Sequence, residues 1–127
     1  MAADPASRPF QRWYTRLLGT DRVEVWLLGW TPGQQVPAHD HGGAAGAFTV
    51  VDGTLVEDQL DPGTWTSRRR TTFPAGSRTH FGPDHAHILG NRGIQPATSV
   101  HAYSPPGLPL RFSAAPAVAH APAEATR

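Results

Sequence analysis

The order of apolar and polar positions divides the chain into many short segments that read as half-buried β-strands. Segments rich in β-branched and aromatic residues alternate with turn signals, at a spacing of about eight to twelve residues, which is typical of an all-β sandwich or barrel. Asp52-Gly53 is the strongest hairpin signal. The expected strands are 12–18, 22–30, 47–51, 54–60, 64–70, 78–81 and 97–103, with 108–112 as a last candidate.

The composition supports this fold and narrows the function. Thirteen glycines and thirteen prolines argue against long helices in a chain of 127 residues. A formal net charge of +1 gives no field that would imply nucleic-acid binding. The chain has no cysteine, so disulfides, thiolate metal sites and a cysteine nucleophile are excluded.

The two ends of the chain differ from its middle. Residues 1–9 are predicted to be a flexible leader, residues 10–112 one domain, and residues 113–127 a disordered Ala/Pro-rich tail. With neither an apolar run of transmembrane length nor a signal peptide, we expect a cytoplasmic protein that does not enter a membrane, as a monomer or homodimer. Arg68-Arg69-Arg70 is interpreted as the charged end of an edge strand rather than a nucleic-acid patch.

His39 and His41 are the first candidates for chemistry. Side chains two apart on an extended chain point to the same face, so both imidazoles can reach one point inside a barrel. Imidazole is the commonest protein ligand for Zn, Cu, Fe and Ni, so the pair indicates a metal site. Taken alone, it fits a surface His-x-His about equally well.

The wider spacing resembles the cupin superfamily. Gly33, His39, His41, Gly46 and Gly53 follow the outline of the first cupin motif, although cupins usually carry glutamate where Gly46 stands. The second motif matches residues 82–91, with His87 as the third ligand and Asn91 following it. His85 is a rival ligand by position, while His80 and His120 have no expected role. The resemblance implies a double-stranded β-helix, or jelly roll.

Within the cupins, the chain resembles the cysteine dioxygenase family. The match runs from about residue 12 to residue 112 and is carried by Tyr14-Thr15-Arg16, Trp30, the three histidines, Asn91 and residues 99–106, Ser-Val-His-Ala-Tyr-Ser-Pro-Pro. It implies a mononuclear iron(II) site of His39, His41 and His87, whose second ring nitrogens are held by Asn91 or by backbone carbonyls. Trp26, Trp30, Phe48 and Trp65 are expected in the core.

Two further sets of residues are expected around the metal. Ser99, His101 and Tyr103 alternate along one strand and form a relay in which Ser99 orients His101 and His101 orients the phenol of Tyr103. The resemblance implies that this phenol contacts the iron-bound ligands, that Arg16 binds the substrate carboxylate and that Tyr14 lines the pocket.

The expected reaction is the oxidation of L-cysteine by O2 to cysteine sulfinic acid. The alternatives are a dioxygenase for another small thiol, such as 3-mercaptopropionate, and a metal- or ligand-binding cupin without catalysis. Animal members of the family crosslink a cysteine near position 46 to the matching tyrosine, which the cysteine-free chain cannot do. Only a short leader precedes the Tyr-Thr-Arg strand, which leaves the thiol less certain than the type of reaction.

Overall fold

Ten antiparallel β-strands make up the part of the chain that the computed structural model describes, residues 13–113. The strands are β1 (Trp13–Gly19), β2 (Glu24–Trp30), β3 (Gln35–Asp40), β4 (Ala45–Asp52), β5 (Thr54–Leu60), β6 (Ser67–Pro74), β7 (Arg78–Phe81), β8 (Ala86–Gly90), β9 (Ala97–Ser104) and β10 (Arg111–Phe112). No helix occurs within the described residues, and the predicted all-β class is confirmed.

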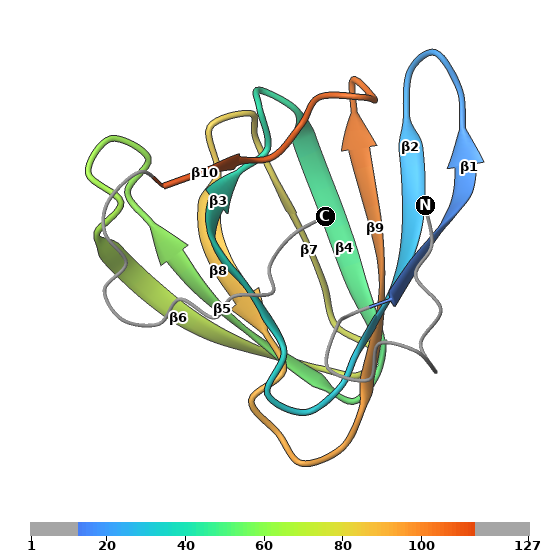
Figure 1. The fold of residues 1–127 in the computed structure, drawn as a ribbon, viewed down its shortest axis with the longest axis vertical. Coiled ribbons are helices and arrows are strands. Elements are labelled where there is room, and N and C mark those ends of the chain that lie inside the picture. The colour runs from blue at the N-terminus through green and yellow to red at the C-terminus, as the bar shows by residue number, and fades with distance from the viewer. Residues whose placement is uncertain (1–12, 114–127) are drawn as a thin grey trace.

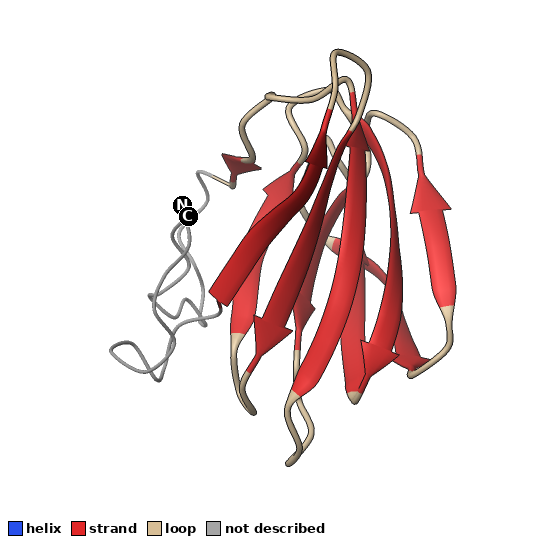
Figure 2. Cartoon of the chain, turned by 90° about the vertical axis from the view of Figure 1, so that its right-hand side faces the viewer, coloured by secondary structure: helices blue, strands red, loops and turns tan. Residues whose placement is uncertain are grey.

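The strands form two five-stranded sheets that face each other. Their orders are β1-β2-β9-β4-β7 and β10-β3-β8-β5-β6, so strands distant in the sequence lie side by side in each sheet. Figure 1 shows the two sheets meeting at its lower end and diverging toward the top, where β10 lies beside β3. Figure 2 shows the same arrangement from the side. The apolar core lies between the sheets and includes Trp30, Phe48, Val50, Leu55 and Leu89.

Most of the predicted strands are present, and the differences have local causes. Residues 64–66 are not part of a strand, because Asp61 starts a turn in which its backbone NH donates to Thr66 O at 2.8 Å. Trp65 has a φ of 62° in this turn and is only half-buried, so its predicted place in the core was wrong. The last strand is limited to Arg111–Phe112. Conversely, His39 belongs to a strand, β3, and His41 directly follows the end of that strand.

A bulge in β3 brings the metal-site residues inward. Val36 and His39 are three residues apart but are both buried, which strict strand alternation forbids. The pairing with β8 shifts by one residue between them, and Pro37, which has no NH to donate to the ladder, lies in this irregular stretch. The extra residue therefore lets one strand supply both a core side chain and a ligand.

The edge of the second sheet carries the arginine run. β6 is the outer strand of its sheet, and Arg68, Arg69 and Arg70 are exposed on it, as predicted for a charged edge. Arg70 pairs with Asp58 at 2.7 Å and Arg68 with Asp61 at 3.3 Å.

Several predictions concern parts of the chain or properties that the fold leaves untested. The leader at residues 1–9 and, apart from Ser113, the tail at residues 113–127 lie outside the described residues. The described residues contain no helix long and apolar enough to cross a membrane. The cytoplasmic location and the oligomeric state stay predictions.

Candidate metal centre and adjoining cavity

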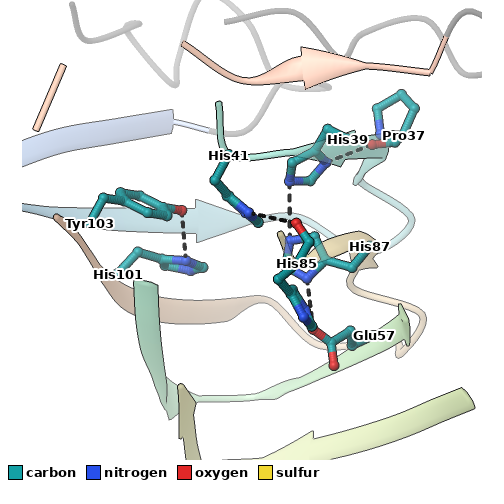
Figure 3. A network of polar contacts seen from close by, with 8 residues as sticks. All are labelled: Pro37, His39, His41, Glu57, His85, His87, His101 and Tyr103. Carbon is teal, nitrogen blue, oxygen red and sulfur yellow. Dashed lines mark hydrogen bonds and ion pairs between the residues drawn. The ribbon is translucent and has the colours of Figure 1, made fainter. Parts of the chain in front are cut away.

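Three histidines meet between the sheets. His39 lies on β3, His41 directly follows that strand, and His87 lies on β8 opposite His39 in the strand register. One ring nitrogen from each lies within 4.8 Å of the other two, and all three side chains are buried. Figure 3 shows the rings converging from these neighbouring strands. The structure thus brings together the three predicted ligands.

A tight turn fixes the position of His41. Gly42 and Gly43 follow it with φ values of 67° and 101°, a region that glycine adopts without strain. Gly42 N donates to Asp40 Oδ1 at 2.9 Å, and Ala44 N donates to His41 O at 3.1 Å. Asp40 also pairs with Arg111 of β10 at 2.9 Å. Burial opposes ionisation of Asp40, but the bonds from Arg111 and from the Gly42 NH, together with the nearby positive charge, lower the pKa of this carboxyl.

Each imidazole is oriented through its Nδ1 atom. His39 Nδ1 donates to Pro37 O at 2.7 Å, and His41 Nδ1 donates to His85 O at 3.2 Å. His87 Nδ1 donates to a Glu57 carboxylate oxygen at 2.7 Å. With every Nδ1 proton assigned to an acceptor, the three Nε2 atoms carry lone pairs toward a common point, the tautomer that a metal site requires.

The arrangement of the Nε2 atoms fits a bound cation. His41 Nε2 is buried and has no hydrogen-bond partner among the described residues. His39 Nε2 and His87 Nε2 lie 3.1 Å apart, although both rings already donate from Nδ1, so two lone pairs face each other unless one ring takes a second proton. Two nitrogens at about 2.1 Å from one metal and at a right angle would be about 3.0 Å apart.

Two of the ligands, His41 and His87, are held in their neutral form. Burial, reinforced by the nearby His87, lowers the pKa of His41 to about 3. Burial also lowers the pKa of His87, against the opposing effect of Glu57. Neutral imidazoles bind metals, whereas imidazolium does not, so these rings are ready to bind a cation at neutral pH.

Glu57, which the sequence analysis did not identify, bonds to the Nδ1 side of His87, away from the converging Nε2 atoms. A single carboxylate oxygen accepts from His87 Nδ1 at 2.7 Å and from His85 Nε2 at 2.8 Å. Burial opposes ionisation, but these two bonds outweigh it and lower the pKa of Glu57 to about 2. Strand alternation could have revealed it, because Glu57 shares the inward face of β5 with the fully buried Leu55.

His85 supports the site without pointing into it, whereas Asn91 bonds elsewhere. The His85 ring turns toward Glu57, and its backbone oxygen accepts from His41. The expectation that Asn91 holds a ligand nitrogen was wrong, because its amide donates to Trp30 O and Gln95 O and accepts from Gly93 N in a neighbouring turn. The alternative expectation, backbone carbonyls, holds for His39 and His41.

The predicted relay lies beside the histidines on β9. Ser99 and His101 are buried on the inward face of β9, and Tyr103, two residues further on, is half-buried. Ser99 Oγ and His101 Nε2 are 2.7 Å apart, and His101 Nδ1 and Tyr103 Oη are 3.3 Å apart. The Tyr103 ring stacks on His41 with centroids 5.6 Å apart, and Figure 3 shows it beside the three histidines.

A small cavity joins the metal centre to the relay. Its lining includes His39 and His87 on one side, His101 and Tyr103 on another, and apolar side chains from Trp26, Leu28, Trp30, Val36, Leu89 and Leu110. Tyr14 also lines it, packed edge-on against Trp26 with ring centroids 5.7 Å apart.

Arg16 lies outside this cavity. It is exposed on β1 and is not among the lining residues, and its guanidinium lies beside Gly19, with Cζ 2.9 Å from where a Cβ would stand on that glycine. The side chain would have to turn toward the cavity to meet a ligand there.

Gly46 lies where the strands leave no room for a side chain. It pairs with Phe81 of β7 and with Tyr103 of β9. A Cβ at this position would lie 2.5 Å from the Phe81 ring and 3.1 Å from the Tyr103 ring. Phe81 in turn stacks on His41 with centroids 4.6 Å apart. An aromatic ring therefore fills the space beside the metal centre and the phenol.

Comparison with solved structures identifies the class. A double-stranded β-helix protein from Klebsiella pneumoniae subsp. pneumoniae MGH 78578 is 21% identical and superposes with a TM-score of 0.68, covering 81% of this chain and 84% of that one. The TT1209 protein from Thermus thermophilus is 17% identical, with a TM-score of 0.66 and coverages of 83% and 98%. These likenesses show a double-stranded β-helix, the fold of the cupins.

A third solved structure is matched over a smaller share of its own chain. Recombinant oxalate oxidase in complex with glycolate is 21% identical with a TM-score of 0.69, and the match covers 88% of this chain but only 59% of that one. At this identity the likeness shows the fold alone. No curated protein matches the chain significantly.

The family model described as cysteine dioxygenase type I matches residues 9–112. The chain belongs to this family.

Proposed function

We propose that the protein is a mononuclear iron(II) thiol dioxygenase that oxidises L-cysteine with O2 to cysteine sulfinic acid. One observation carries the proposal: three imidazoles converge without a carboxylate ligand, and a buried relay ends in a phenol on the same cavity. The carboxylate nearest to the ligands, Glu57, bonds to the Nδ1 side of His87 rather than joining the Nε2 atoms. Three neutral donors leave a metal its full positive charge, which favours an anionic thiolate.

His39, His41 and His87 would hold iron(II), which would let electrons pass from sulfur to dioxygen, a redox role that zinc cannot fill. The chain's own residues position the substrate. The apolar walls of the cavity exclude water from the thiol, and Tyr103 is placed to hydrogen-bond a substrate atom that gains negative charge. Both oxygen atoms end on sulfur, so the thiol becomes a sulfinic acid without another co-reactant.

The identity of the thiol depends on Arg16. For cysteine, the guanidinium binds the carboxylate through paired hydrogen bonds once it has turned toward the cavity. Its exposed position in the structure also suits the alternative, in which 3-mercaptopropionate or another small thiol binds without Arg16. Tyr14 lines the cavity and would contact either substrate.

Oxygen consumption by the iron-loaded protein tests the proposal. We expect uptake that depends on both iron and thiol, fastest with L-cysteine in a panel that includes 3-mercaptopropionate and cysteamine, and a sulfinic acid product by mass spectrometry. Faster turnover of 3-mercaptopropionate would favour the alternative substrate. Iron binding without uptake for any thiol would reject the enzyme and leave a metal-binding cupin.

Tyr103→Phe separates catalysis from metal binding. The variant keeps the ring that stacks on His41 but loses the hydroxyl. We expect unchanged iron content and a kcat lower by about 10²–10³-fold, the usual cost of losing one hydrogen-bond donor to developing charge. Loss of iron would place Tyr103 among the ligands instead.

A further inference from the structure

Trp30 closes the buried end of the relay on β9. It lies on β2, is 2% exposed, and its indole Nε1 donates to Ser99 Oγ at 2.9 Å. An indole NH can only donate a hydrogen bond, so the direction of this bond is fixed.

The fixed donor determines the direction of the next bond. Ser99 is fully buried, and its hydroxyl contacts two partners among the described residues, Trp30 Nε1 and His101 Nε2. If His101 donated from Nε2, the serine oxygen would accept twice and its own proton would be buried without an acceptor, which is costly. The Ser99 hydroxyl therefore donates to His101 Nε2.

The tautomer of His101 follows, and with it the orientation of the phenol. With Nε2 accepting, the ring proton is on Nδ1, which faces Tyr103 Oη at 3.3 Å. Tyr103 then accepts from His101, and its own proton points away from that ring, on the side of the cavity that the phenol lines. Each group in the relay therefore donates to the next one, from the Trp30 indole through Ser99 and His101 to Tyr103.

We propose that Trp30 is a positioning residue that pins the Ser99 hydroxyl as a donor, fixes the Nδ1–H tautomer of His101 and thereby keeps Tyr103 a hydrogen-bond donor toward the substrate. The opposite tautomer would draw the phenol proton to His101 and present only lone pairs to a negatively charged substrate atom. The role rests on the proposed function for its catalytic meaning, whereas the tautomer itself can be measured without turnover.

Nitrogen NMR of the histidine rings tests the proposal directly. The full chain is ¹⁵N-labelled and loaded with zinc as a diamagnetic metal, and the His101 signals are assigned by their loss in His101→Asn. We expect the Nδ1–H tautomer in the wild type. A proton on Nε2 would overturn the proposal.

Trp30→Phe tests whether the indole sets the tautomer. Phenylalanine keeps an aromatic wall but removes the NH, so the Ser99 hydroxyl is no longer pinned, and the Nε2–H tautomer should become populated. Trp26→Phe is the matched control, because Trp26 lines the same cavity but its NH donates to Glu24 at 2.9 Å. The control should keep the wild-type tautomer. An unchanged tautomer in Trp30→Phe would refute the role of Trp30.

The kinetic consequence distinguishes this proposal from the function itself. In the iron-loaded enzyme, Trp30→Phe should lower kcat by about tenfold, part of the loss expected for a missing donor, with KM and iron affinity little changed. A changed KM with an unaltered kcat would make Trp30 a wall of the cavity only. The expected tautomer in a protein without oxygen uptake would reject the enzyme but not the relay.

Discussion

Glu57 is the residue on which the orientation of two histidines depends. Its single oxygen holds His87 and His85, and the backbone oxygen of His85 holds His41. A buried carboxylate behind a ligand histidine fixes the ring and makes it a stronger donor. The negative charge thus acts on the metal through an imidazole instead of binding it directly.

Replacing this charge should weaken metal binding. Glu57→Gln keeps the shape of the side chain and an accepting oxygen but removes the charge, so we expect iron affinity to fall by about 10–100-fold, as measured by competition with a chelator. Asp52→Asn, an exposed carboxylate on β4, is the control. Equal affinities in the two variants would contradict this support of His87.

Arg16 can bind a substrate carboxylate in the cavity only if its exposed side chain turns toward it. Arg16→Ala should lower kcat/KM for L-cysteine by about 10–100-fold, the range of a hydrogen bond to a charged group, about 1.5–3 kcal/mol. Cysteamine, which has no carboxylate, should be turned over as before. Arg69→Ala on the opposite sheet controls for the loss of an exposed arginine. Unaltered cysteine kinetics in Arg16→Ala would remove the clamp from the proposed function.

Among the strands, the site depends on how closely β4, β7 and β9 approach one another. Gly46 faces Phe81 on one side and Tyr103 on the other. Cross-strand neighbours of this kind stabilise a sheet when their side chains are complementary, here two rings over a glycine. The same rings contact His41, so the packing of three strands reaches the metal centre.

A methyl group at this junction should be destabilising. Gly46→Ala should lower the free energy of unfolding by about 1–3 kcal/mol, because the new Cβ would lie 2.5 Å from the Phe81 ring. Gly82→Ala, just after β7, meets no atom within 4 Å and is the control in urea unfolding. Phe81→Leu in the Gly46→Ala background should recover part of the loss. A neutral Gly46→Ala variant would show that the Phe81 ring moves aside freely.

At the scale of the whole molecule, the two sheets enclose charged and titratable groups at one end of the core. His41 is buried and neutral, and Glu57 is buried and ionised, so both make folding sensitive to acid. Between pH 6.5 and about 3, the unfolded chain binds a proton at His41 that the folded chain does not. Between pH 4.5 and about 2, unfolded Glu57 binds a proton while folded Glu57 stays ionised.

Both effects have the same sign, so the metal-free protein should lose stability as the pH falls. The loss should begin below pH 6.5 from His41 and steepen below pH 4.5 from Glu57. Denaturant unfolding at a series of pH values measures it, and His41→Gln should flatten the upper part of the profile. Constant stability from pH 7 to pH 5 would contradict the burial of a neutral His41.

Local sequence patterns were enough to predict most strands and which of their residues share a face. Strand alternation placed His39 with His41 and Ser99 with His101 and Tyr103, because the two-residue period is a property of the extended backbone. Turn residues marked most strand ends for the same local reason. The cupin spacing added His87, which the register of β3 and β8 brings opposite His39.

Which side chains meet across the barrel, in contrast, became known from the folded structure alone. The contacts of Glu57 with His87 and of Trp30 with Ser99 join residues 30 and 69 positions apart, and no local pattern encodes such pairs. Phe81 filling the space over Gly46 and Arg16 lying outside the cavity likewise follow from how the strands pack. Backbone periodicity gives each side chain its face, whereas its neighbours and its proton depend on the strands folded against it.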